Sequence, residues 1–85
     1  MLSHPKAKAN TYTYSGTAYR MWARIDVIDA DSISTLEPEK TGYNVSSVST
    51  SYLESDTEEC FFIGNHEIQD TSSSGVQTAT TSKSY

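Results

Sequence analysis

The sequence predicts a small all-β domain, built as an antiparallel sheet of three or four strands with extended arms at its N- and C-terminal ends. With 85 residues, the chain has room for one domain. Apolar and polar residues alternate over a long central stretch, which is the pattern of a half-buried strand. Cys60 is the only cysteine, so an intrachain disulfide is excluded and the sheet must be held by its own core.

Residues 1–16 are expected to form an extended basic arm. Pro5 and Gly16 disfavour a helix, and Tyr12 and Tyr14 alternate with threonines in a pattern that suits a strand. The segment is poor in large aliphatic side chains, so it cannot bury enough apolar surface to offset the entropy of its own ordering. It should therefore take its order from contacts elsewhere.

The best-patterned segment runs from Thr17 to Ala30 and predicts a strand with one buried face. Its apolar face would carry Tyr19, Met21, Ala23, Ile25 and Val27, and its polar face Arg20, Trp22, Arg24 and Asp26. A shift of one residue would expose the whole apolar set, so the register of this strand should be firmly fixed. We expect it to anchor a small β domain that spans residues 17–70.

A loop and then a second strand are expected after this segment. The alternation stops from Asp29 to Gly42, and Pro38 leaves space for no more than one helical turn after Ser34, so this stretch should be a loop. Residues 43–53 are rich in valine, threonine and tyrosine, which favours a strand. Their apolar phase changes near Ser46-Ser47, which predicts either a bulge there or a twisted edge strand.

The C-terminal half should supply a hairpin and a tail. Cys60-Phe61-Phe62-Ile63 is the most apolar tetrapeptide, and Gly64-Asn65 has the form of a two-residue hairpin turn before His66-Glu67-Ile68. Residues 71–85 hold nine serines or threonines in fifteen positions and no acid, and this composition is typical of a disordered tail when the segment is taken alone.

Charge is divided along the chain. All eleven carboxylates lie between Asp26 and Asp70, where Lys40 is the only base, whereas residues 1–25 carry four bases and no acid. Separated blocks of opposite charge steer association and fix its orientation. This layout favours a protein that binds another macromolecule.

The polar face of the central strand offers the clearest candidate site, because Arg20 and Arg24 flank Trp22 there. The trio could be a hot spot for a protein partner, with Tyr12 and Tyr14 of the arm as further contacts. It could also stack bases and grip phosphates. In a third, structural interpretation the indole packs under a loop and the arginines pair with nearby acids. The acidity of the rest of the chain disfavours phosphate, so direct nucleic-acid binding is not expected.

An acidic patch is formed by Glu54, Asp56, Glu58 and Glu59. Such a run is commonly a solvated loop that keeps a small protein soluble. It could instead imitate a phosphate backbone and occupy the groove of a nucleic-acid-binding protein. A calcium site near Asp29 and Asp31 would lack the glycine and the terminal glutamate of an EF-hand loop.

No metal, cofactor or enzymatic activity is expected. Metal-capable atoms occur in Cys60, His66, Glu67 and Asp70, but one histidine and one cysteine make a poor zinc set. A serine triad can be drawn through any chain this rich in serine, so His66 and Asp70 are no evidence of one. The sequence has no nucleophile elbow and no phosphate-binding glycine loop.

These observations favour a non-enzymatic structural accessory protein, for example of a virus or phage particle, that binds larger subunits through its β body and its arms. Self-association of the chain is a further option. The alternative is a small acidic inhibitor of the phage counter-defence type, which blocks a nucleic-acid-handling protein by imitating its ligand. No apolar run of signal-peptide or membrane-spanning length is visible, so we expect a location in the virion or the cytoplasm and no membrane partner.

Overall fold

The computed structural model describes residues 4–13, 15–29 and 38–85, and these residues form an all-β domain with no helix. Their strands are antiparallel, as the sequence predicts. In chain order the strands are β1 (Lys6–Ala7), β2 (Asn10–Tyr12), β3 (Ala18–Asp29), β4 (Glu39–Val45), β5 (Ser47–Ser49), β6 (Leu53–Glu54), β7 (Cys60–Gln69) and β8 (Val76–Ser84).

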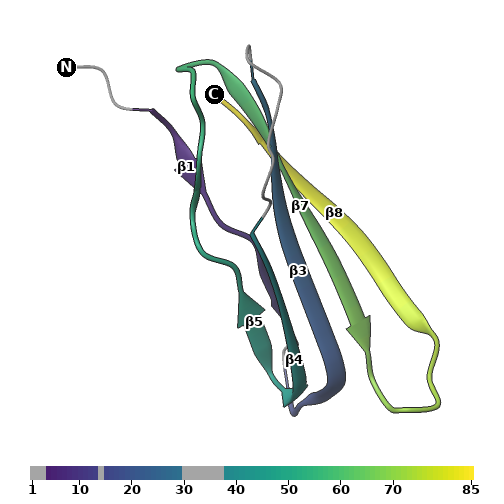
Figure 1. The fold of residues 1–85 in the computed structure, drawn as a ribbon. Coiled ribbons are helices and arrows are strands. Elements are labelled where there is room, and N and C mark those ends of the chain that lie inside the picture. Colours follow the sequence, from purple (N-terminus) through teal and green to yellow (C-terminus); the bar gives the residue numbers. More distant parts are fainter. Residues whose placement is uncertain (1–3, 14, 30–37) are drawn as a thin grey trace.

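Four strands form the main sheet, in the order β4-β3-β7-β8 (Figure 1). The centre of the sheet is the pairing of β3 with β7, in which Ala23 stands opposite His66 and Ile25 opposite Gly64. β4 and β8 lie at the two edges. The predicted antiparallel sheet is therefore confirmed, with four strands.

The described N-terminal residues pair with residues 46–55, and the two segments form a narrow ribbon that we call the covering ribbon. Within it β1 pairs with β6 and β2 with β5. Between these two short ladders the Thr50 N–H donates a hydrogen bond of 2.9 Å to the carbonyl of Ala9. Ala9 and Val48 of the ribbon share one apolar cluster with β3 and β7, so the ribbon covers one face of the main sheet.

The core lies between the main sheet and the covering ribbon. Met21, Ala23 and Ile25 are buried, as the alternation along β3 predicts. The remaining buried apolar residues are Ala9, Ala18, Val48, Cys60 and Phe62. Ala9 and the buried Thr11 precede the domain expected at residues 17–70. Small side chains give little hydrophobic signal in a sequence, yet they let the ribbon approach the sheet closely.

Two residues of the predicted apolar face are less buried than expected. Val27 is half-buried, and Tyr19 keeps 37% of its surface exposed. Tyr19 lies near the beginning of β3, where its ring packs edge-on against Tyr43 with 5.7 Å between the ring centroids. The alternation thus predicts which side chains point toward the ribbon, but it does not predict how far along β3 the cover extends.

The hairpin predicted at Gly64-Asn65 is wrong, because β7 runs without a break from Cys60 to Gln69. Gly64 serves close packing and not a turn. A Cβ atom at this position would lie 2.5 Å from the hydroxyl oxygen of Thr81 and 3.0 Å from Nε2 of His66. A glycine inside a strand can mark such a close approach, and the sequence pattern does not separate this role from a turn.

The prediction of a loop from Asp29 to Gly42 is wrong at both ends of this range, where the described residues belong to strands. β3 extends to Asp29, and β4 already begins at Glu39, directly after Pro38. A proline is compatible with the beginning of an edge strand, because no ladder hydrogen bond depends on its missing N–H there. The helical turn that could follow Ser34 lies outside the described residues.

Near Ser46-Ser47, where the apolar phase changes, the structure has a break between two strands and not one continuous strand. β4 ends at Val45 and pairs with β3 in the main sheet, whereas β5 begins at Ser47 and pairs with β2 in the covering ribbon. Asn44 has a φ of 54°, which places it in the left-handed region that asparagine tolerates better than most residues. This backbone turn takes the chain from one layer to the other.

Val76–Ser84 forms β8, although the composition of this segment is typical of disorder when it is taken alone. β8 pairs with β7 from Val76 opposite Gln69 to Ser84 opposite Phe61. Threonine suits an extended backbone, and β7 supplies the hydrogen-bonding partner that the isolated segment would lack.

Candidate functional site

The clearest candidate site is the face of the main sheet that points away from the covering ribbon, which we call the outer face. Met21 and Ala23 point into the core, so Trp22 between them points to the opposite side. At the same level Glu67 stands opposite Trp22 on β7, and Thr78 stands opposite Glu67 on β8. The residues of the outer face that form the candidate site are Arg20, Trp22, Arg24, Asp26, Asn65, Glu67, Thr78 and Thr80.

Both arginines of the outer face are paired with carboxylates. Arg20 Nη1 lies 3.2 Å from Glu67 Oε1, and Arg24 Nε lies 3.2 Å from Asp26 Oδ2. Asp26 also accepts a hydrogen bond from the side chain of Asn65. The arginine–acid pairing expected under the structural interpretation is therefore confirmed. Because each guanidinium has an acid beside it, the attraction of this face for a phosphate backbone is weakened.

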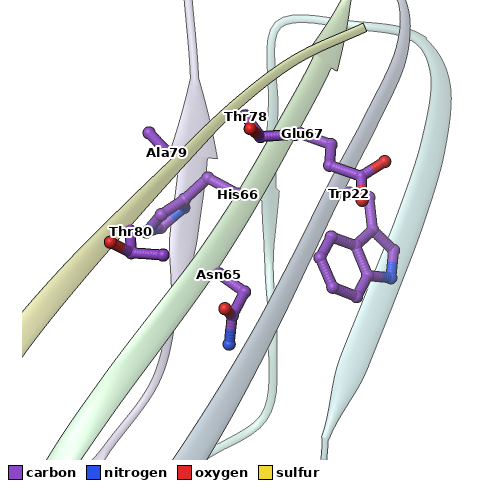
Figure 2. A pocket seen from close by; sticks show the side chains of 7 residues that line it. All are labelled: Trp22, Asn65, His66, Glu67, Thr78, Ala79 and Thr80. Atoms are coloured by element: carbon purple, nitrogen blue, oxygen red, sulfur yellow. The ribbon is translucent and has the colours of Figure 1, made fainter.

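Trp22 is half-buried and lines a shallow depression of about 460 Å³. The guanidinium carbon of Arg24 lies 5.7 Å from the centre of the indole ring, within the range of a cation–π contact. Figure 2 shows the side chains that line this depression, which come from β3, β7 and β8. An open hollow on the surface of a sheet suits the surface of another protein better than an enclosed small molecule.

The structure describes one of the two tyrosines predicted to join this site, and it lies in the other layer. Tyr12 is exposed on β2, in the ribbon that covers the other face of the sheet, and Tyr14 lies outside the described residues. The basic side chains of the same segment contact the ribbon itself. The ammonium groups of Lys6 and Lys8 lie 5.1 Å and 5.2 Å from the ring centre of Tyr52.

The acidic patch lies apart from the outer face, on β6 and on the connection from β6 to β7. Its four side chains, those of Glu54, Asp56, Glu58 and Glu59, are exposed. Buried Ser55 orders this connection, because its hydroxyl donates a hydrogen bond of 2.7 Å to the carbonyl of Thr57. Of the two suggested calcium ligands, Asp29 belongs to β3 and Asp31 lies outside the described residues.

His66 ties together four parts of the fold. Its Nδ1 lies 2.8 Å from the hydroxyl of Thr11 and its Nε2 lies 2.9 Å from the hydroxyl of Thr81. Thr11 donates its single hydroxyl proton to the carbonyl of Trp22, at 3.0 Å, so Nδ1 of His66 must be the donor to Thr11. Nε2 then accepts from Thr81. No pattern of neighbouring residues predicts this structural role for His66, because both of its partners are distant in the chain.

Burial lowers the pKa of His66 below its ordinary value of 6.5. Between the lowered pKa and 6.5 the unfolded chain binds more protons than the folded one, so this contribution to stability is complete above 6.5 and is lost as the pH falls below it. We expect the melting temperature to decrease from about pH 7 to about pH 5. Thermal unfolding across this range should show a shallower dependence for His66→Gln than for His4→Gln, and equal slopes would contradict the assignment.

The residues considered as metal ligands do not converge. His66 and Glu67 are neighbours on β7 and therefore point to opposite faces of the sheet. Cys60 is buried at the beginning of the same strand. Within residues 4–13, 15–29 and 38–85, no three histidine, cysteine, aspartate or glutamate side chains gather closely enough to hold a metal ion.

Comparisons of the chain with known protein families, with curated proteins and with solved structures gave no match. In the part of the chain that the structure describes, no helix is long and apolar enough to cross a membrane. The function therefore has to follow from the chemistry of the outer face and of the strand edges.

Proposed function

We propose that this chain is a non-enzymatic accessory protein that binds a larger protein subunit, for example in a virus or phage particle, through its outer face. The position of Trp22, the only tryptophan of the chain, carries this proposal. Trp22 stands half-buried beside an open depression, on a sheet whose other face is covered. Tryptophan and arginine are the residue types that contribute most to binding energy at protein interfaces.

The ion pairs of the outer face support the same function. Arg20 is held by Glu67 and Arg24 by Asp26, so the groups around Trp22 are already oriented before a partner arrives. A preformed surface loses less conformational entropy on binding than a surface of free side chains. Binding would then need no folding step at this face.

The terminal segments enter this proposal as strands. The described N-terminal residues pair with residues 46–55, and Val76–Ser84 pairs with β7. Strands of this kind can still add to a neighbouring sheet through an unpaired edge. The further ordering of residues 1–16 and 71–85 in an assembly stays a prediction of the sequence.

Trp22→Ala is expected to weaken partner binding by about 2 kcal/mol, roughly thirtyfold in Kd, because it removes the central anchor of the interface. The immobilised chain would first capture the partner from its native source. Isothermal titration would then compare the identified partner against the wild-type chain and the variant. A variant that loses more folding stability than binding energy would favour the structural interpretation of Trp22.

Tyr12→Ala is the matched comparison, because it removes an exposed aromatic residue from the opposite layer. If the outer face alone binds the partner, the Kd of Tyr12→Ala should equal that of the wild type. A loss equal to that of Trp22→Ala would mean that the partner contacts both layers. A single-stranded oligonucleotide included in the same titrations should not bind.

The acidic inhibitor remains a second candidate function, because all four carboxylates of the acidic patch are exposed, on β6 and on the ordered connection that follows it. Exposed acids in one array are what a nucleic-acid mimic requires. Reversal of these four residues to lysine should abolish binding under this function and leave it nearly unchanged under the first. The charge-reversed chain and Trp22→Ala, titrated against the same partner, therefore separate the two functions.

A further inference from the structure

β8 forms one edge of the main sheet and pairs with β7 on one side only (Figure 1). Its nine residues are all exposed, and Lys83 is the only charged residue among them. Proteins usually protect an edge of this length with several charges, a proline or a bulge, because unpaired backbone groups attract another strand. In the described residues, nothing covers the free side of β8 and its register with β7 is unbroken.

The opposite edge of the sheet is protected. β4 begins with the charged pair Glu39 and Lys40, and its other end turns away at Asn44, where φ is 54°. The chain then continues into the covering ribbon. The two edges of the sheet therefore differ, and β8 is the one that remains suited to strand addition.

The hydrogen bonds to β7 show which backbone groups of β8 face outward. The N–H of Tyr85 donates to the carbonyl of Cys60 at 2.8 Å, and the N–H of Cys60 donates to the carbonyl of Tyr85 at 3.2 Å. In an antiparallel pair such doubly bonded positions alternate with open ones. Residues 77, 79, 81 and 83 therefore point their backbone groups at β7. The outward set is Val76, Thr78, Thr80, Ser82 and Ser84.

We propose that β8 pairs with β8 of a second copy of this chain, antiparallel and about a twofold axis at Thr80. In this register Thr80 faces Thr80, Thr78 faces Ser82, and Val76 faces Ser84. Every residue of the outward set then meets another member of the same set, so each of their N–H and C=O groups gains a partner. The two sheets join into one, and both outer faces lie on the same side.

The side chains of β8 agree with this register. Lys83 would stand opposite Gln77, so no like charges face each other across the twofold axis. Residues 71–85 contain no acid, and the net charge of -5 on each copy therefore arises away from the contact. Salt screens such distant repulsion, so association should strengthen as the ionic strength rises.

This contact is small, because it consists of backbone hydrogen bonds and short side chains. It belongs with interfaces below about 1,200 Å² of total buried surface, which are commonly transient. We therefore expect a dimer that forms reversibly with concentration. The proposal is independent of Trp22, whose replacement by alanine should not change the dimerisation constant.

Sedimentation equilibrium of the full chain, from about 10 µM to about 1 mM, tests the proposal. Thr80→Lys and Thr80→Glu each place like charges opposite each other at the axis, so each variant alone should dimerise up to about fivefold more weakly than the wild type. An equimolar mixture of the two variants should recover the dimer, because lysine then faces glutamate. That recovery requires Thr80 of one copy to lie close to Thr80 of the other, as the proposed register places them.

A pair of proline variants tests the backbone directly. Thr80→Pro removes an outward N–H, so the chain should stay folded and become monomeric. Ala79→Pro removes an N–H that faces β7, so it should lower the melting temperature. A wild-type chain that stays monomeric at about 1 mM, or single charge variants that dimerise as well as the wild type, would overturn the proposal.

Discussion

Ile25→Asp is expected to unfold the domain. Ile25 is 3% exposed and lies in the core beneath the covering ribbon, opposite Gly64 of β7. A carboxylate there would be buried without a partner, which costs more than about 4 kcal/mol. Small domains have only about 5–15 kcal/mol of total stability, and a chain of this length stands near the lower limit. Circular dichroism should show loss of the strand signal, or a melting temperature far below that of the wild type.

Ile28→Asp is the matched control for this experiment. Ile28 lies on the same strand, three residues further along, and is 55% exposed. The same change of side chain should therefore alter stability by less than about 1 kcal/mol. Equal melting temperatures for Ile25→Asp and the wild type would mean that the core does not lie where β3 and the covering ribbon meet.

Phe62→Ala is expected to cost about 3–5 kcal/mol, because it removes a large side chain from the core and leaves a cavity there. Phe62 is 2% exposed and is among the largest fully buried side chains of the domain. Its ring also packs edge-on against Tyr85, with 5.7 Å between the centroids. Chemical denaturation should report the loss as a lower midpoint with an unchanged slope.

Phe61→Ala provides the comparison, because Phe61 is the neighbouring residue on β7 and is 37% exposed. Successive residues of a strand point to opposite faces, so only Phe62 reaches the core. The cost at Phe61 should stay near 1 kcal/mol. A larger cost at Phe61 than at Phe62 would show that the assigned faces of β7 are reversed.

The sequence predicts the fold class and the central strand because both depend on local alternation. Met21, Ala23 and Ile25 occupy the buried face that the period of two assigns to them. Trp22 and the two flanking arginines occupy the polar face for the same reason, since adjacent side chains of a strand point in opposite directions. The part of the candidate site that lies on β3 alone can therefore be predicted from the sequence.

Features that depend on pairing between distant segments are not predicted. The sequence predicts a turn at Gly64, because the residue that requires a glycine there, Thr81, is distant in the chain. The composition of residues 76–84 predicts disorder, because these residues are ordered by hydrogen bonding to β7 and not by burial of their own side chains. In the same way, Glu67 can be identified as the partner of Arg20 only once the register is known, because the two residues lie on different strands.

The pairing of β3 with β7 also governs how this protein reaches its native state. It joins Asp29 to Cys60 and continues to Arg20 and Gln69, so the two central strands meet only after a long stretch of chain has been closed into a loop. That closure costs entropy before any contact compensates for it, which places the domain among slow folders, on the scale of milliseconds to seconds. Until then the apolar stretch at residues 60–63 is unprotected, and intermolecular association competes with folding.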